Sequence, residues 1–567
     1  MSDRILAIVP ARGGSKGVRR KNLRLLNGRP LLYYTLKMAL GSQRIHDVVL
    51  TSEDEDILAY GRQFGVLLRQ RPPALAEDHV TLAPVVKDAL DWVAMEKGPY
   101  SLVVRLQPTC PLLQPETLDR AIESFLKQGV DTLLSVVEDT HLMWREQDGR
   151  TVPDYAERVN RQRLPRRYRE SGAFFITRPE FVTESGGFGP RVSVLEISAE
   201  EGVDIDTRAD WLVAEALLRK LRIAIVTSSN SSVGTGHLYR MLTLADSLLG
   251  HDIAFVAVDT DDRGLSLIEE HGYPVAQAHP GETLGRLAAL RADIIVNDTL
   301  DTRAEDIRRQ KELGAFVVNF EDLGSGSDEA HLVFNALYEN SQPKSFHRFG
   351  HEYFCLPWRF ASVSPADFRH PAETLLITFG GVDLNNLTCQ VIGILPAVLE
   401  AAPILSVQVV LGLGYPHDAE LGEAMRRLPK AVAGKIDIQR NVKNMATVMR
   451  QADLAVTSNG RTVYELAAMG VPTISISQND RETMHLFARY SSGVRYLGMA
   501  SAQTPQQVQE ALVDILSRPE LRRAMRDALL QTDLRSGLSR VLDEIQREYW
   551  RWKNAQRDHD WQANAPV

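Results

Sequence analysis

Cysteine is scarce in this chain of 567 residues, which has only Cys110, Cys355 and Cys389. An odd number of widely spaced cysteines excludes a disulfide scaffold and a clustered cysteine–zinc site, and it fits a reducing compartment. No apolar run approaches the roughly 18 residues of a membrane span, and the first run, Ile5–Pro10, is too short for a signal sequence. We therefore expect a cytoplasmic protein without a membrane partner.

The chain also lacks an excess of positive charge. Lys and Arg together number 65 and Asp and Glu 73, which gives a formal net charge of −8 and a pI near 6.0. A mildly acidic surface binds nucleic acid poorly as a whole, so any site for a polyanion must be local. The hydrophobic fraction of 44% and the charged fraction of 24% are ordinary for folded proteins. At roughly 100–200 residues per domain, the length predicts three or four folding units.

Short apolar segments alternate with helical periods through the first 220 residues, which predicts a parallel α/β sheet in a first domain, 1–220. The expected strands are 5–10, 48–50, 102–106 and 132–137, and the expected helices are 31–40, 54–64, 115–127 and 210–218.

A fresh strand at 222–227, followed by a second glycine-rich loop, starts the other half of the chain. The pattern lapses at 340–371 and then resumes, which predicts two Rossmann-like lobes, 221–355 and 356–545, and a helix or tail at 546–567. We expect the tryptophans of this tail to pack on a lobe rather than to bind nucleic acid. The expected strands of the lobes are 222–227, 293–296, 316–319, 374–379, 406–411, 454–458 and 473–476.

A basic, glycine-rich loop follows the first predicted strand directly. Residues 12–17 have the sequence RGGSKG, and residues 19–22 add Arg, Arg, Lys and Asn. Glycines let backbone N–H groups approach an oxyanion, and the surrounding cations suit a triphosphate. A plain basic turn is the alternative. The loop is not a Walker motif, because the pattern GxxxxGK[ST] is absent.

Two further charged groups stand out in the first half. Asp204 and Asp206 are two residues apart, so on a strand their carboxylates share one face and suit Mg²⁺, although an acidic strand end is an equally good interpretation. The run RQRLPRRYR at 161–169 has five arginines. A nucleic-acid patch is the alternative there, but no series of stacking aromatics accompanies it, and arginine forks also suit a sugar carboxylate or pyrophosphate.

Residues 3–218 resemble the sialate-type cytidylyltransferases, which activate nine-carbon acidic sugars (nonulosonic acids) as CMP conjugates. The resemblance rests on the motifs IVPARGGSKGVRRKNL, TSEDEDI, RPPALAED, LQPTCPLL, NRQRLPRRYRESGAFFI and VDIDT. It implies that the sugar's anomeric hydroxyl attacks the α-phosphorus of CTP and expels pyrophosphate. The sequence departs from the family at Cys110, where serine is usual, and at Leu113, where arginine is usual.

The resemblance also implies roles for individual residues. CTP would be bound by Arg12, Gly13, Ser15, Lys21, Asn22 and Arg71, and Arg12, Lys16 and Lys21 would neutralise its phosphates during catalysis. Gln107 and Arg161 would receive the acidic sugar, and Asp204 and Asp206 would hold Mg²⁺.

In the second half, His237 lies at the start of a predicted helix beyond Gly234-Thr235-Gly236. A helix N-terminus favours the neutral form of a histidine, so we interpret His237 as a general base, with a structural histidine as the alternative. Loops at Gly380-Gly381 and 458–465 offer backbone N–H groups for a diphosphate and a carboxylate for ribose. Asn479 follows the end of a later strand, at an edge where ligands bind.

The motifs GTGHLYRMLTLADSL, FGGVDLNNLT and SNGRTVYELAAMGVP resemble the UDP-sugar hydrolase of pseudaminic acid biosynthesis, a relative of two-lobed glycosyltransferases. The resemblance implies that His237 activates water and that UDP and a free 2,4-diacetamido-2,4,6-trideoxyhexose are released. Asp298 is the second acid–base candidate, and it is followed by Leu300 where that family has tyrosine. The expected UDP-sugar contacts are Gly236, Gly381, Thr462, Glu465 and Asn479.

Together, these features predict an α/β protein in which a Rossmann-like nucleotidyltransferase domain is followed by a two-lobed, GT-B-like module. The hypothesis is a bifunctional enzyme of nonulosonic acid biosynthesis, which we expect to assemble as a homo-oligomer and to use CTP, a nonulosonic acid and a UDP-sugar. Two alternatives stay open for the second half, namely a glycosyltransferase and a module that binds a nucleotide sugar without turnover. The sequence does not distinguish pseudaminic, legionaminic and neuraminic stereochemistry, because epimers differ in hydrogen bonds that no motif encodes.

Overall fold

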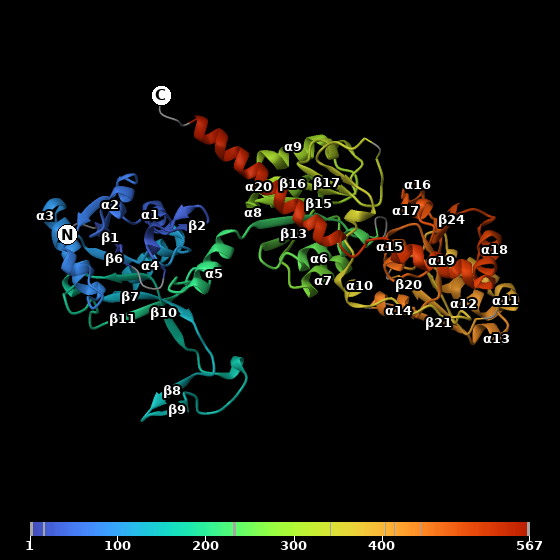
Figure 1. Cartoon of the computed structure of the whole chain (residues 1–567), viewed down its shortest axis with the longest axis horizontal. Coiled ribbons are helices and arrows are strands. Elements are labelled where there is room, and N and C mark those ends of the chain that lie inside the picture. The colour runs from blue at the N-terminus through green and yellow to red at the C-terminus, as the bar shows by residue number, and fades with distance from the viewer. Residues whose placement is uncertain are drawn as a thin grey trace. The chain divides into compact units, whose positions relative to one another are not determined.

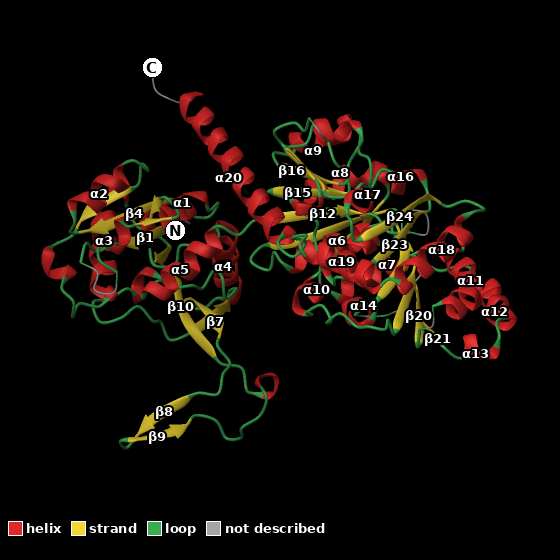
Figure 2. Cartoon of the chain, turned by 45° about the vertical axis from the view of Figure 1, so that its right-hand side comes forward, coloured by secondary structure: helices red, strands yellow, loops and turns green. Residues whose placement is uncertain are grey.

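The computed structural model describes residues 4–14, 18–230, 234–340, 342–402, 404–412, 414–440, 442 and 444–563, with side chains described to residue 556. The chain forms two compact units, Met1–Lys220 and Leu221–Val567. In each unit helices flank sheets of mainly parallel strands, so the predicted α/β class is confirmed (Figures 1 and 2). Among the residues that the structure describes, no helix has both the length and the apolar character needed to cross a bilayer.

The described residues of the first unit form a seven-stranded sheet with the order β11-β7-β10-β6-β1-β4-β5. The predicted parallel α/β sheet is confirmed for the other strand pairs of this sheet, but β10 runs antiparallel to both β6 and β7. The strands are β1 (Ile5–Pro10), β4 (Asp47–Ser52), β5 (Leu67–Gln70), β6 (Leu102–Leu106), β7 (Thr132–Glu138), β10 (Tyr168–Thr177) and β11 (Val192–Glu196). The short strands β2 (Leu25–Leu26) and β3 (Arg29–Pro30) pair separately.

Strand β1 is buried along its whole length because both faces of the sheet are covered there. Ala7 and Val9 face a core that includes α1 (Leu31–Gly41), α2 (Glu55–Arg62) and α4 (Pro115–Gln128). Leu6 and Ile8 face α3 (Leu82–Lys97) on the other side. This alternation of two buried faces produces the continuous apolar run in the sequence. Helix α5 (Arg208–Leu218) closes the unit.

A two-stranded ribbon, β8 (Trp144–Gln147) and β9 (Arg150–Pro153), extends away from the sheet of the first unit (Figure 2). It belongs to the long excursion between β7 and β10. The arginine-rich run begins in the same excursion, at the single turn Arg161–Arg163. After this excursion the chain rejoins the sheet as β10, which runs antiparallel to its neighbours β6 and β7.

The first lobe of the second unit is a parallel sheet with the order β14-β13-β12-β15-β16-β17-β18. Its strands are β12 (Arg222–Thr227), β13 (Asp252–Val258), β14 (Val275–Ala278), β15 (Ile294–Asp298), β16 (Phe316–Phe320), β17 (Leu332–Asn335) and β18 (His347–Phe349). Its helices are α6 (Gly236–Asp246), α7 (Asp262–Glu270), α8 (Thr283–Leu290) and α9 (Ala304–Glu312).

The second lobe is a parallel sheet with the order β21-β20-β19-β22-β23-β24. Its strands are β19 (Thr374–Thr378), β20 (Ser406–Leu411), β21 (Ile436–Arg440), β22 (Leu454–Ser458), β23 (Thr473–Ser477) and β24 (Val494–Met499). Its helices are α11 (Leu387–Ala401), α12 (Asp418–Arg427), α13 (Lys430–Ala433), α14 (Met445–Gln451), α15 (Arg461–Ala468), α16 (Asp480–Thr483), α17 (Phe487–Tyr490), α18 (Thr504–Ser517) and α19 (Pro519–Leu530).

The segment between the lobes, which contains α10 (Trp358–Ser362), packs against the second lobe. Phe354, Leu356 and Phe360 are buried in one core with residues of α14 and α15. Arg535 donates hydrogen bonds to the carbonyls of residues 360, 361, 363 and 468. These contacts join the end of the first lobe to the second lobe through a shared core.

The last helix, α20 (Gly537–Ala563), begins before residue 546, where the sequence pattern placed the final segment. Val541, Ile545 and Tyr549 are buried in the core of the first lobe. Trp550 and Trp552 pack on the same core, as the sequence predicts. The end of the chain thus returns to the lobe with which the second unit begins.

Candidate active sites

The first candidate site lies at the carboxyl edge of β1 and β6, where the strand order of the first unit reverses. Ligands of open α/β sheets bind at such a switch point. The loop after β1 carries Arg12, Gly13, Lys21 and Asn22, and Gln107 follows β6 directly. Ser15 and Lys16, also predicted in this loop, lie outside the described residues.

Glu53 joins the loop after β1 to Arg71. Its carboxylate accepts the Gly13 N–H at 2.7 Å and an Arg71 N–H at 2.7 Å. A Cβ at Gly13 would lie 2.3 Å from a carboxylate oxygen of Asp54, so this position requires glycine. Arg71 is only 4% exposed, and its Nε has no described partner. Glu53 therefore holds the Arg71 side chain in place, while the Nε–H of Arg71 stays free to donate a hydrogen bond.

The remaining loop residues are fixed by their own contacts. The Asn22 amide donates to the Arg12 carbonyl at 2.9 Å, and the Arg12 guanidinium donates to Asp78 at 3.2 Å. The Lys21 ammonium donates to the Ile205 carbonyl at 2.5 Å and to Asp206 at 3.2 Å. Lys21 thereby links the β1 loop with the pair of aspartates predicted to hold a metal.

Contrary to the expectation from the sequence, Asp204 and Asp206 do not lie on a strand but in the irregular segment before α5, and their surroundings differ. Burial, with the charge of Asp206 added, raises the pKa of Asp204, although Thr109, Lys21 and Arg169 oppose the shift. Asp204 Oδ1 is buried and completes no hydrogen bond of ordinary geometry with a described residue, whereas Asp206 is exposed. An unsatisfied carboxylate oxygen beside a second carboxylate fits Mg²⁺, a cation that takes oxygen ligands and keeps several waters. Within the described ranges, no group of three His, Cys, Asp or Glu side chains forms a metal site.

The structure brings Gln107 to the aspartates but does not bring Arg161. A Cβ at Gly172 would lie 3.2 Å from Gln107 Nε2 and 3.4 Å from Asp204 Oδ2, so the side chains of Gln107 and Asp204 both lie beside Gly172. The Arg161 side chain is exposed, and no hydrogen bond, ion pair or ring contact joins it to any described residue. Its predicted part in binding the acidic sugar stays a prediction.

The two departures from the family pattern are both buried. The Cys110 thiol donates to the Ser171 carbonyl at 3.1 Å, and burial raises the pKa of this thiol. Leu113 is packed in the main core of the first unit. Neither side chain reaches the surface of the site.

The second candidate site lies where the two lobes of the second unit meet. Each lobe has a switch point, between β12 and β15 in the first lobe and between β19 and β22 in the second. A Cβ at Gly381, after β19, would lie 3.3 Å from the Thr235 hydroxyl, and one at Gly236 would lie 3.5 Å from Arg461 Cδ. The predicted loops of both lobes are therefore in contact.

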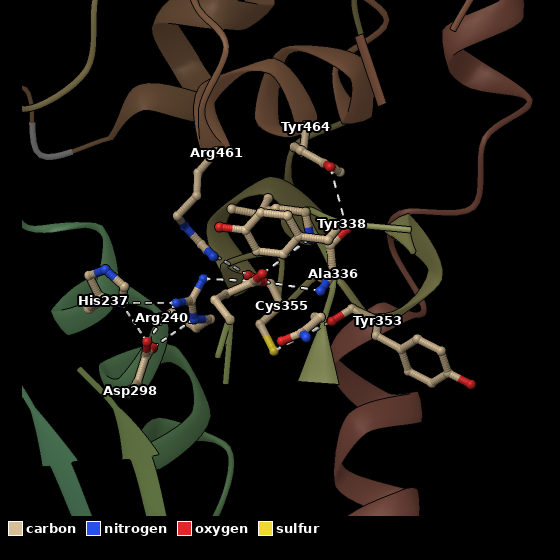
Figure 3. A network of polar contacts seen from close by, with 12 residues as sticks. His237, Arg240, Asp298, Ala336, Tyr338, Tyr353, Cys355, Arg461 and Tyr464 are labelled. Atoms are coloured by element: carbon tan, nitrogen blue, oxygen red, sulfur yellow. Dashed lines mark hydrogen bonds and ion pairs between the residues drawn. The ribbon is translucent and has the colours of Figure 1, made fainter. Parts of the chain in front are cut away.

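His237 belongs to a network with Asp298 and Arg240 (Figure 3). The Asp298 carboxylate, which is fully buried, lies 2.5 Å from His237 Nδ1 and accepts two N–H groups of Arg240 at 2.6 and 2.7 Å. A carboxylate only accepts, so Nδ1 carries the hydrogen of this contact, and the neutral form of the ring with this tautomer has its lone pair on Nε2. Nε2 makes no hydrogen bond with the described residues, and the ring can act as a base there.

Burial alone would raise the pKa of Asp298, but Arg240 and His237 hold it below its ordinary value. Asp298 is therefore held in its ionised form beside His237, and its predicted role as an acid–base residue stays a prediction. Glu321 lies behind this pair. Its carboxylate accepts from Arg240 at 3.5 Å and from the N–H groups of Ala336 and Leu337, and burial raises its pKa although Arg240 opposes the shift.

Arg461 enters the same network from the second lobe (Figure 3). It opens helix α15, donates to the Cys355 carbonyl at 3.0 Å and stacks over the Phe354 ring at 4.6 Å. Its Nη1 is buried without a described partner. Burial and the nearby Arg240 lower the pKa of Arg461, so this is a place where negative charge would be favoured.

The other predicted UDP-sugar residues surround the start of α15. Thr462 and Glu465 are half-buried on this helix, and burial raises the pKa of Glu465 while Arg461 opposes the shift. Asn479 caps α16, where its side-chain oxygen accepts the Glu482 N–H at 2.9 Å. The Glu482 carboxylate accepts the Gln478 N–H at 2.7 Å, and burial raises its pKa to about 7.

Sequence reasoning missed Arg240, Glu321, Arg461 and Glu482. One signal was available for Arg240, because it lies three residues after His237 on a helix and therefore on the same face. Glu321 follows a predicted strand end, 81 residues from Arg240. No local pattern indicates that these two side chains meet.

Comparisons with known proteins agree on the first unit. Residues 6–184 match the family model described as cytidylyltransferase. The chain is 31% identical over 222 residues to the pseudaminic acid cytidylyltransferase of Campylobacter jejuni, covering 38% of this chain and 96% of that protein. It is 29% identical over 235 residues to the CMP-N,N'-diacetyllegionaminic acid synthase of Legionella pneumophila, covering 39% and 100%.

One further relative is covered less completely, and a solved structure is similar to the other half of the chain. An uncharacterized protein of Methanocaldococcus jannaschii is 28% identical over 277 residues, covering 46% of this chain and 56% of that protein. The chain thus spans little more than half of this relative. Among solved structures, MurG of Acinetobacter baumannii is similar over 57% of this chain and 99% of its own, with 17% identity and a TM-score of 0.44.

Proposed function

The chain belongs to the cytidylyltransferase family through its first unit, and from this premise we propose that residues 1–220 transfer CMP from CTP to a nonulosonic acid. The observation that supports the proposal best is the convergence at one sheet edge. The cations Arg12 and Lys21 of the β1 loop, Arg71, Gln107 and the carboxylates of Asp204 and Asp206 all lie at this edge.

In the proposed reaction the sugar's anomeric oxygen forms a bond to the α-phosphorus of CTP, and the bond from that phosphorus to the oxygen bridging to the β-phosphate breaks. The proton of the anomeric hydroxyl passes to water. Pyrophosphate leaves with the electron pair. The chain supplies mainly charge neutralisation, because Arg12, Lys21 and Arg71 place cations around the loop that would hold the phosphates. Mg²⁺, when bound by Asp204 and Asp206, would supply further positive charge at the same phosphates.

The proposal is tested by incubating the full chain with CTP, Mg²⁺ and a panel of pseudaminic, legionaminic and neuraminic acids. We expect pyrophosphate release that depends on one of these acids, with an equimolar CMP-sugar. Release that is the same without any acid, or no release with all of them, would contradict the proposal. The panel also identifies which stereochemistry the enzyme accepts.

For the second unit, we infer hydrolysis of a UDP-sugar. In this reaction a water oxygen attacks the sugar's anomeric carbon, its proton passes to His237 Nε2, and UDP leaves with the electrons of the broken C–O bond. The supporting observation is the His237–Asp298 pair at the first lobe's switch point, beside the glycine loop and the α15 N-terminus of the second lobe. The backbone N–H groups of this glycine loop and of the α15 N-terminus, together with Arg461, suit the diphosphate of UDP.

Three outcomes distinguish this function from its alternatives when the full chain is incubated with UDP-diacetamido-trideoxyhexoses. UDP release without an acceptor supports the hydrolase. UDP release only when an acceptor sugar is added would identify a glycosyltransferase instead. Saturable binding without UDP release would identify a module that binds nucleotide sugars without turnover.

A further inference from the structure

Arg105 is an arginine in an interior strand that has no polar partner among the described residues. It lies on β6, where the other four residues are buried, and it is itself half-buried. No hydrogen bond or ion pair joins its guanidinium to the described part of the chain, and its Nε is completely buried. Because a guanidinium keeps its charge, this position carries a positive charge that the described residues do not pair.

The contacts that Arg105 does make are apolar. Its guanidinium lies over the ring of Phe175, its register partner on β10, at 4.5 Å, and Phe175 meets Phe188 edge-on at 4.9 Å. Phe175 also packs with Leu134 and Val136, in a small cluster that contains only strand residues. Stacking on a ring orients the plane of the guanidinium without using its N–H donors. The donors therefore stay available to a ligand.

Glu170 is the carboxylate whose charge acts on Arg105, but it does not pair with this arginine. Burial lowers the pKa of Arg105, and Glu170, on β10, opposes the shift through its charge. Glu170 is nevertheless exposed, and the two groups form no ion pair. Within the first unit, the charge of Glu170 therefore balances the positive charge of Arg105 only weakly.

Arg105 lies next to the candidate site of the first unit. Gln107 is two residues further along the same strand direction, roughly 7 Å away at the strand rise of about 3.3 Å per residue. The side chains of Gln107 and Asp204 both lie beside Gly172. Gly172 is on β10, three residues before Phe175. The unpaired guanidinium is therefore within the reach of a sugar-sized ligand bound at Gln107.

We propose that Arg105 binds the carboxylate of the acidic sugar, an inference that rests on the proposed function of the first unit. The planar N–H fork of arginine matches a carboxylate with two parallel hydrogen bonds. In a nonulosonic acid the carboxylate is bonded to the anomeric carbon, which also carries the attacking hydroxyl. Arg105 thus selects acidic sugars and orients the nucleophile at the same time.

The test compares Arg105→Met and Arg105→Lys with the unaltered full chain, using the accepted nonulosonic acid and its neutral carboxamide as sugar substrates. Arg178→Met is the matched control, because Arg178 also lies over a ring, that of Phe125, but follows the far end of β10. For Arg105→Met we expect kcat/KM for the acid to fall roughly 10- to 100-fold, the range of a charge-assisted hydrogen bond pair, while KM for CTP stays unchanged. The preference for acid over carboxamide should fall to near unity, and Arg105→Lys should retain part of it.

Stability separates a ligand-binding role from a structural one. Arg105 makes no hydrogen bond to a described residue, so its replacement by methionine breaks no such bond. The Tm of Arg105→Met should therefore be equal to or higher than that of the unaltered chain. An unchanged acid preference would overturn the assignment, and so would a strongly lowered Tm accompanied by equal losses for both sugars. Absence of CMP transfer by the unaltered chain would instead overturn the proposed function, and this assignment with it.

Discussion

Replacing Asp298 with asparagine tests how the second site makes a base of His237. The substitution keeps the shape of the side chain but removes the charge that faces His237 and Arg240. The Asp298 carboxylate makes three contacts, one with His237 and two with Arg240. In the asparagine variant, the amide N–H group replaces one carboxylate oxygen and faces an N–H donor of His237 or Arg240. Breaking a buried ion pair costs about 3–5 kcal/mol, and here the cost should be near the lower figure because Glu321 stays beside Arg240.

A loss of about 3 kcal/mol leaves a domain of ordinary stability, roughly 5–15 kcal/mol, folded at 25 °C. The effect on the rate is expected to be separate. Without the carboxylate, the hydrogen of His237 is no longer fixed on Nδ1, and general-base catalysis contributes roughly 10²–10⁴-fold. We therefore expect UDP release by Asp298→Asn to fall at least about 100-fold. UDP release and the urea unfolding midpoint would be measured on the same preparation.

Asp322→Asn is the matched control for this experiment. Asp322 is also buried, and it accepts hydrogen bonds from Thr302, Gly324 and Asn319 rather than from His237. Its replacement should lower the unfolding midpoint but leave the rate of UDP release close to that of the unaltered chain. If Asp298→Asn releases UDP at the unaltered rate, or if both variants slow equally, the orienting role of Asp298 is refuted.

Three further outcomes are expected. Burial raises the pKa of Glu482 to about 7 from an ordinary 4.5, so the folded state holds more protons between these values and the unfolding free energy of the second unit should fall as pH rises through that window. Glu482→Gln should flatten this dependence in urea titrations from pH 5 to 8, and an unaltered slope would contradict it. Tyr549→Ala should lower the unfolding free energy by about 3–5 kcal/mol, whereas the exposed Tyr490→Ala should change it by less than about 0.5 kcal/mol, and equal effects would contradict the packing of α20. Separate chains 1–220 and 221–567 should each be soluble and unfold cooperatively, and two insoluble products would show that the units depend on each other.

The sequence pattern predicted no strand at the positions of β5, β10, β11, β13, β14, β17, β18, β21 and β24. The strands that it did predict are short apolar runs, most of them buried on both faces. Strand β1 and the strands β19 and β22 of the second lobe have this character, and each is followed by glycine or polar residues at the ligand edge. The direction of β10 was not predictable. It depends on the long excursion before it, whose path no local pattern encodes.

Residues of the candidate sites differed in the same way. Gly13 and His237 stand in local motifs, so their chemistry could be inferred from neighbouring residues. Arg240 and Glu321 meet only because β12 and β15 are adjacent and β16 follows them in the sheet. Helix α20 was placed too late in the chain, because its apolar face is defined by a lobe that ended about 190 residues earlier.

The central claim is that one chain carries two independent reactions, and a comparison of Asp206→Asn with His237→Asn tests it most directly. Both variants of the full chain are assayed for acid-dependent pyrophosphate release from CTP and for UDP release from the UDP-sugar. Asp206→Asn should abolish the first reaction and leave the second unchanged, and His237→Asn should lose at least about 100-fold of the second and leave the first unchanged. Loss of both reactions in either variant, or undiminished activity in both, would contradict the account.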